Sequence, residues 1–175
     1  MLKVMTLSRE LYTHSLNVCL LGVGLATALG WQRDQVSSLG VALFFHDLGL
    51  AEDAGQESVP LPLSLHDEEA LSPHAEASAQ AVAQLPEVDD EALEMVRCHH
   101  ENLDGSGSPR GLSSTQLSAA ARLARIVDIY ERATSGCFKS EVLSAFAALQ
   151  MMRNEMREQL DQEMLSALVR FLGQA

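Results

Sequence analysis

The chain of 175 residues has the length of one ordinary domain, and its apolar content of 47% is enough to bury a continuous core. Its 24 acidic residues outnumber its 12 basic residues, which gives a formal net charge of -12. Because such a surface repels a polyanion, this composition argues against binding of duplex nucleic acid, although a small phosphorylated ligand can still bind in a pocket lined by metal ions.

The three cysteines are odd in number and show no CxxC spacing. This usage is typical of reduced thiols in a cytoplasmic protein. We expect residues 1–175 to form one domain, with a chemically active core at about residues 8–134 that is completed by helices at about residues 139–173.

The first predicted helix begins after an N-cap at Ser8, runs to about Leu29 and ends at Gly30. Glu10 and His14 lie one turn apart on the same side of this helix. Both side chains bind metal ions in other proteins, so this face is a candidate ligand surface.

The same segment carries no charged residue from Leu11 to Gln32, so a membrane span or a signal peptide is the alternative interpretation. The stretch nevertheless contains His14, Ser15 and Asn17. We favour a buried core helix that carries ligands on one face, and we expect no membrane association.

A second helix is expected from a cap at Asp34 to the pair His46-Asp47, with Gly49 behind it. The following segment, Leu50 to Ser72, is acidic and contains prolines. It is therefore predicted to be a long connection.

Ser72 and Pro73 form a cap followed by a proline at the first helical position. This pattern places His74 in the first turn of a short helix that ends near Pro86. Five further elements are expected downstream: a helix from Asp89 or Asp90 to His99-His100, a loop at 102–111, a helix from Ser118 to about Thr134, and two amphipathic helices at about 140–157 and 161–172. No strand pattern stands out, so the chain is predicted to be an all-α bundle of about six to eight helices.

Candidate metal ligands recur at widely separated points. They are Glu10, His14, His46, Asp47, His74, His99, His100 and Asp128. A single histidine on a helix is more often an ordinary hydrogen-bonded residue, but adjacent His-Asp and His-His pairs at helix ends favour a shared site. A second His-Asp pair, His66-Asp67, lies in the acidic connection and is interpreted as solvated. Imidazole and carboxylate suit iron, manganese, nickel or zinc, and paired ions are typical of phosphoester or amide hydrolysis.

The order of these motifs resembles the HD-GYP branch of the HD phosphohydrolase superfamily. The resemblance covers about Glu10 to Thr134. It rests on His14, on His-Asp-Leu-Gly at 46–49, on His74, on His-His-Glu-Asn-Leu-Asp-Gly-Ser-Gly-Ser-Pro-Arg-Gly-Leu at 99–112, and on Ala-Arg-Ile-Val-Asp at 124–128. The block at 99–112 is far more specific than the His-Asp pair alone.

The resemblance implies a helical bundle with two or three divalent metal ions, iron or manganese being favoured, that opens cyclic di-GMP or a related phosphoester. It places His46 and Asp47 at the catalytic centre and makes Glu10 a ligand of the three-metal variants. The loop would border the substrate through six residues: Asp104, Gly105, Gly107, Ser108, Pro109 and Arg110.

Three positions depart from the family pattern. Ser108 replaces the signature tyrosine, while Leu50 and Cys137 replace cations that contact substrate phosphate in the family. Arg110 or Lys139 are candidates to take over that contact. Because the loss of one such group typically slows a reaction by about 10²–10³-fold, a signalling module that binds metal and a nucleotide or protein partner without turnover is the alternative function. A purely structural metal bundle is a third one.

The last two helices carry apolar stripes rather than ligands. One stripe consists of Leu143, Phe146 and Leu149, and the other of Leu165, Leu168 and Leu172. We interpret them as a packing or dimerisation face, so a homodimer or a regulatory protein partner is expected.

Overall fold

The computed structural model describes residues 9–53, 68–86, 88–135 and 142–173. The elements are α2 (Arg9–Ala28), α3 (Arg33–Phe45), α4 (Leu48–Asp53), α5 (Glu68–Val82), α6 (Asp90–Cys98), a short 3-10 turn (Ser114–Gln116), α7 (Ala119–Ser135), α8 (Ala145–Asn154) and α9 (Gln162–Leu172). Within these ranges the only β contact is an isolated bridge between Asp104 and Ser113. The prediction of an all-α helical bundle is confirmed.

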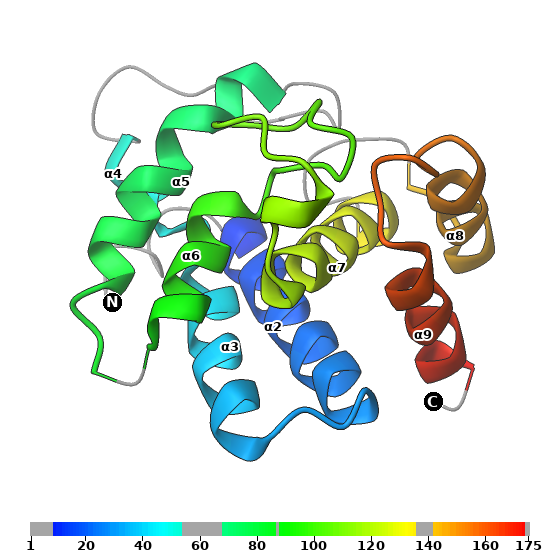
Figure 1. Cartoon of the computed structure of the whole chain (residues 1–175), viewed down its shortest axis with the longest axis horizontal. Coiled ribbons are helices and arrows are strands. Elements are labelled where there is room, and N and C mark those ends of the chain that lie inside the picture. The colour runs from blue at the N-terminus through cyan, green and yellow to red at the C-terminus, as the bar shows by residue number, and fades with distance from the viewer. Residues whose placement is uncertain (1–8, 54–67, 87, 136–141, 174–175) are drawn as a thin grey trace.

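Helices α2 and α7 occupy the middle of the bundle (Figure 1). Helix α2 packs against α3, α7 and α9, and α7 also contacts α6, α8 and α9. The pairs α4 with α5 and α5 with α6 complete one side, while α8 and α9 cover the other side. The central pair therefore links the two groups of peripheral helices.

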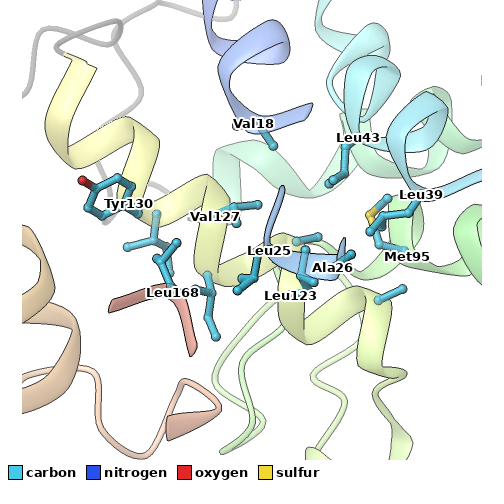
Figure 2. Close-up of a cluster of buried hydrophobic side chains, with 14 of the residues drawn as sticks. Val18, Leu25, Ala26, Leu39, Leu43, Met95, Leu123, Val127, Tyr130 and Leu168 are labelled. Atoms are coloured by element: carbon cyan, nitrogen blue, oxygen red, sulfur yellow. The ribbon is translucent and has the colours of Figure 1, made fainter. Parts of the chain in front are cut away.

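Apolar side chains from several of these helices meet in one continuous core (Figure 2). Leu25 of α2, Leu43 of α3, Leu123 of α7 and Leu168 of α9 are all fully buried. By length and composition alone, residues 11–28 of α2 would pass as a membrane span. In the structure, this helix supplies buried side chains to the core, as predicted from the sequence.

The predicted end of the first helix is confirmed. Gly30 has a φ of 78°, its N–H donates to the carbonyl of Thr27 at 3.0 Å, and the N–H of Trp31 donates to the carbonyl of Ala26 at 3.1 Å. This pair of hydrogen bonds is the Schellman arrangement that glycine favours because the backbone must turn left-handed. The predicted cap Ser8 lies outside the described residues.

The predicted cap of the second helix is wrong by two residues. Helix α3 is capped at Gln32, whose N–H donates to the side chain of Gln35 at 3.1 Å, and Asp34 lies within the first turn. The acidic side chain still benefits there from the partial positive charge of the helix N-terminus.

Gly49 is not the helix stop that was predicted. It lies inside α4, which begins directly after Asp47, and its N–H donates to the hydroxyl of Ser78 at 2.8 Å. A Cβ atom on Gly49 would lie 2.4 Å from the carbonyl oxygen of His74. The glycine therefore allows α4 to pack closely on α5 beside a candidate ligand.

The predicted boundaries around His74 are also wrong. Helix α5 begins at Glu68, five residues before Pro73, and ends at Val82 rather than near Pro86. An interior proline lacks the N–H that would bond to the preceding turn, and its ring crowds that turn. The packing of α5 against α4 and α6 offsets this cost, so the helix extends through Pro73. The predicted connection is correspondingly shorter, because α4 takes up its first residues; residues 54–67 lie outside the described part.

Candidate metal centre

Seven of the predicted ligands meet at one buried place. His14 comes from α2, His46 and Asp47 follow α3, and His74 lies in α5; His99 and His100 follow α6, and Asp128 lies in α7. None of these residues is more than 5% exposed. Five separate helices therefore direct polar side chains into the same interior region.

Asp47 lies at the centre of this cluster. Its Oδ2 atom is 3.5 Å from Nε2 of His14 and 3.4 Å from Nε2 of His46. Its Oδ1 atom is 3.0 Å from Nε2 of His74 and 3.4 Å from Nε2 of His99. The two oxygens of one carboxylate thus face two different groups of histidines.

The cluster divides into two halves that share this carboxylate. In one half, Nε2 of His14 is 3.3 Å from Nε2 of His46, and Asp128 Oδ1 is 3.2 Å from His14 Nε2. In the other half, Nε2 of His74 is 3.3 Å from the Nε2 atoms of both His99 and His100. Each half brings together atoms of the kind that coordinate one divalent ion.

The outer nitrogens of three histidines show that their inner nitrogens carry lone pairs. Nδ1 of His14 lies 2.5 Å from a carboxylate oxygen of Glu131. Nδ1 of His46 and Nδ1 of His99 lie 2.7 and 2.6 Å from the carbonyl oxygens of Leu43 and Val96. Because an acceptor faces each Nδ1, the proton of the neutral ring belongs there, and Nε2 of the neutral ring can bind a cation. Nε2 atoms of neutral imidazoles and carboxylate oxygens that converge on one buried region are donors that a divalent ion would satisfy, so the residues fit a metal site.

The acid-base properties of the cluster agree with this assignment. Burial lowers the pKa of His46 to about 4. Burial also holds the pKa of His100 well below its usual value, assisted by the positive charges of its neighbours. Burial alone would raise the pKa of Asp47, but the surrounding histidines outweigh it and hold that pKa well below its ordinary range. At neutral pH these groups are neutral imidazoles and an ionised carboxylate, which are the forms that bind metals.

His14 behaves differently. Burial alone would lower its pKa, but hydrogen bonds to Asp128, Asp47 and Glu131 raise it well above the usual value. A divalent ion placed among the same carboxylates would compete with this proton. Metal binding is therefore expected to release a proton from the His14 side of the cluster.

Hydrogen bonds to Glu101 and His100 hold the loop that follows the His-His pair. Glu101 is buried, and its two carboxylate oxygens accept the N–H groups of Arg110 at 2.7 Å and Leu112 at 2.9 Å. The N–H of Ser108 donates to the carbonyl of His100 at 3.2 Å. Gly107 packs against this same backbone, since a Cβ atom there would lie 2.3 Å from Asn102 N.

The six predicted substrate residues all lie in this loop. Gly105 has a positive φ, and Asp104 accepts hydrogen bonds from the backbone and the hydroxyl of Ser106, so both residues shape a turn. Ser108 and Pro109 are joined by a cis peptide bond. Arg110 forms an ion pair with Glu94 and donates to the sulfur of Cys98 at 2.8 Å. Its guanidinium is thus held by α6.

Most of the other predicted positions lie wholly or partly outside the described residues. Glu10 lies in the first turn of α2, but its side chain is outside the described part of the chain, as are Cys137, Lys139 and the pair His66-Asp67. Leu50 lies in α4 and is partly buried.

Three buried charged residues on α7 were not predicted from the sequence. Arg125, Glu131 and Arg132 are each at most 4% exposed. They lie three residues before, three after and four after Asp128, which is the spacing of one helix face. That spacing was the available signal, because ionised side chains on the apolar face of a helix need partners in the interior.

Comparisons with known proteins agree with the fold. A family model described as HD domain matches residues 18–164. Cyclic di-GMP phosphodiesterase PA4108 of Pseudomonas aeruginosa is 28% identical over 180 residues, which cover 99% of this chain and 42% of that protein. 3'3'-cGAMP-specific phosphodiesterase 1 of Vibrio cholerae is 27% identical over 165 residues, covering 93% of this chain and 38% of that protein. The chain thus spans less than half the length of these curated relatives.

Solved structures show the same architecture. Bd1817, an HDG"Y"P protein from Bdellovibrio bacteriovorus, superposes with a TM-score of 0.73 at 20% identity, covering 93% of this chain and 52% of that one. The HD domain of the L. monocytogenes phosphodiesterase PgpH in complex with cyclic-di-AMP gives a TM-score of 0.64 at 12% identity, covering 97% and 92%.

The match over most of its length shows that the chain belongs to the HD domain family. Within that family it is a member of the HD-GYP type, with Gly-Ser-Pro at the signature position.

Proposed function

We propose that this chain is a metal-dependent phosphodiesterase that hydrolyses cyclic di-GMP or a related cyclic dinucleotide. The observation that carries the proposal is the convergence of the Nε2 atoms of buried histidines on both oxygens of Asp47. Relatives named as cyclic di-GMP and 3'3'-cGAMP phosphodiesterases support the substrate class.

The proposed cofactors are two divalent ions, with iron or manganese favoured over nickel or zinc. His14, His46, Asp47 and Asp128 would hold one ion, and Asp47, His74, His99 and His100 the other; Glu10 is the proposed additional ligand of a third. When bound, such ions make a water molecule more acidic and neutralise the charge of a phosphodiester.

The residues of the chain have distinct roles in this proposal. Asp47 sets the spacing of the two halves, because its two oxygens face different histidines. His46 and Asp47 are the proposed catalytic pair. The loop from Asp104 to Arg110 would border the substrate, and its position depends on the hydrogen bonds of Glu101.

Two observations favour the alternative of a signalling module with weak or no turnover. Leu50 offers no charge to a phosphate, and the guanidinium of Arg110 is engaged by Glu94 and Cys98 on α6. Arg110 would have to leave these partners to replace the missing cations.

Other aspects of the whole protein also remain proposals. The contacts of α9 with α2 and α7 support one domain over residues 1–175, in which the helices at 139–173 complete the metal-binding core at 8–134. We further propose a cytoplasmic location. The exposed Phe146 at the start of α8 supports a homodimer or a regulatory protein partner, since it leaves a large apolar side chain in solvent.

The test is hydrolysis of cyclic di-GMP, 3'3'-cGAMP and cyclic di-AMP by the chain loaded with manganese or iron. We expect a linear dinucleotide or mononucleotide product, and a loss of at least about 10²-fold in rate for Asp47→Asn. The matched control is Asp34→Asn, since Asp34 is exposed on α3, and it is expected to keep full activity.

Two results would change the proposal. Binding of a cyclic dinucleotide without turnover would favour the signalling module. A rate that is unaffected by Asp47→Asn would contradict the proposed centre.

A further inference from the structure

The two halves of the cluster differ in the groups that face their outer histidine nitrogens. We name them the His14 half (His14, His46, Asp47 and Asp128) and the His100 half (Asp47, His74, His99 and His100). Groups that touch the outer nitrogen of a metal-binding histidine fix its tautomer and change metal affinity about 10–100-fold. A difference in these groups between the two halves therefore changes how tightly each half binds a metal ion.

In the His14 half, a buried carboxylate accepts a hydrogen bond from the outer nitrogen of His14. Glu131 accepts from Nδ1 of His14 at 2.5 Å, and its other oxygen accepts from the side chain of Asn17 at 2.9 Å. Glu131 is 2% exposed, so this carboxylate acts in a region of low dielectric. The carbonyl of Leu43 is likewise an acceptor for Nδ1 of His46. Both imidazoles of this half are oriented with Nε2 toward the carboxylates of Asp47 and Asp128.

The charge on this half also favours a cation. Asp128 belongs to this half alone, and Asp47 contributes one of its oxygens. Glu131 adds a third carboxylate behind His14. Arg132 offsets part of this charge, because its guanidinium lies 3.6 Å from the outer oxygen of Asp128.

In the His100 half, a hydrogen-bond donor instead of an acceptor faces the outer nitrogen of His100. Nη1 of Arg125 lies 3.5 Å from Nδ1 of His100, and a guanidinium nitrogen can only donate a hydrogen bond. This contact favours the tautomer of His100 with its proton on Nε2, the atom that must bind the metal. Arg125 is held in place, since its Nε donates to Asn102 at 2.9 Å.

The other ligands of the His100 half do not compensate for the unfavourable contact between Arg125 and His100. In the described part of the chain, Nδ1 of His74 has no hydrogen-bond partner, so no acceptor fixes its tautomer. Among the described contacts of this half, His99 alone has a carbonyl, that of Val96, at its Nδ1. Asp47 supplies the only carboxylate among the named ligands of this half, and it is shared.

We propose that the two halves bind divalent ions with unequal affinity, the His14 half tightly and the His100 half weakly, and that Glu131 and Arg125 are the positioning residues that set this difference. The inference rests on the proposed function only in that both halves hold metal. At limiting metal the chain holds one ion, and the second binds only as the free metal concentration rises.

The test is calorimetric titration of metal-stripped protein with Mn²⁺, followed in parallel by electron paramagnetic resonance. We expect two binding phases whose dissociation constants differ by at least about tenfold. At one equivalent the spectrum should be that of an isolated ion, and spin coupling should appear only during the second phase.

Variants on α7 assign the phases. Glu131→Ala is expected to weaken the first phase about 10–100-fold, while Glu131→Gln, which keeps an acceptor for His14, recovers most of the affinity. Arg125→Met, which removes the donor and the charge, is expected to tighten the second phase about tenfold and to leave the first unchanged. The matched control is Arg122→Met, because Arg122 lies one turn away on the same helix and pairs with Asp161, outside the cluster.

The outcomes separate this inference from the proposed function. Two phases of equal affinity in the wild-type chain overturn the inference whatever the stability of the variants, and so does a shift of both phases together in Arg125→Met. A chain that binds no manganese contradicts the proposed metal centre itself. Unequal phases without hydrolysis support the inference while the proposed phosphodiesterase fails.

Discussion

At the scale of single residues, Gly107 shows how closely the loop and the metal centre are joined. A Cβ atom at this position would lie 2.5 Å from the carbonyl oxygen of His100 and 2.5 Å from the Cα of Glu101. Both are backbone atoms, so no rotation of a side chain relieves the overlap. The absence of a side chain at Gly107 therefore lets the loop lie on the His-His segment.

We expect Gly107→Ala to lower the free energy of unfolding by about 1–3 kcal/mol, because the inserted methyl group forces the backbone apart. The measurement is urea denaturation of the metal-stripped chain. Gly173→Ala is the control, since the nearest atom to its Cβ would be 3.4 Å away. Equal stability of the two variants would show that the loop does not pack on the His-His segment as described.

At the scale of helices, the sequence predicted some helix ends correctly and others wrongly. Gly30 predicted a helix end because a left-handed residue leaves few alternatives, and Asp89 predicted a helix start because its side chain accepts the N–H of Ala92. Pro73 led to a wrong boundary, since a proline is tolerated inside a helix when packing supplies the remaining energy. Gly49 led to a wrong helix end because its role is close packing of two helices, which depends on tertiary structure.

The N-cap of α6 provides a prediction at this scale. Asp89→Ala is expected to destabilise the chain by about 1 kcal/mol, because the N–H of Ala92 loses its acceptor at 2.8 Å. Asp89→Asn, which keeps a side-chain oxygen, should retain most of the stability. Urea midpoints measure both effects, and equal losses in the two variants would argue against a capping role.

At the scale of the whole molecule, the sequence predicted the candidate ligands that meet in the structure, but it did not predict the residues that contact the outer nitrogens of their histidines. The residue types of the ligands and the His-His block indicate a metal centre by themselves, because adjacent pairs of this kind are rare by chance. Glu131 and Arg125 were missed, because which histidine each one touches depends on how α7 packs against α2 and against the segment after α6. Sequence patterns describe the face of a helix, whereas contacts across the bundle require the assembled fold.

The stability of the metal-stripped chain should depend on pH through the buried histidines. The pKa of His46 is lowered to about 4 in the folded chain, whereas the unfolded chain takes up this proton near 6.5. Acidification between these values therefore favours the unfolded state, and His46 alone should cost about 3 kcal/mol of stability over this interval. Above pH 6.5 the contribution is absent, because His46 is neutral in both states.

Comparison of the wild-type chain with His46→Gln isolates this effect from that of His14, whose raised pKa acts in the opposite direction. The stability of His46→Gln should fall less steeply from pH 6.5 to 4, as measured by urea denaturation at several pH values. Parallel curves for the two proteins would contradict the buried, neutral state of His46.

The most direct test of the metal centre is a crystal structure of the chain grown with manganese or iron, with anomalous scattering recorded at the absorption edge of the metal. We expect at least two anomalous peaks, one bordered by His14, His46, Asp47 and Asp128 and one by Asp47, His74, His99 and His100. An absence of peaks between these side chains at saturating metal, or imidazoles turned away from Asp47, would contradict the proposed metal centre.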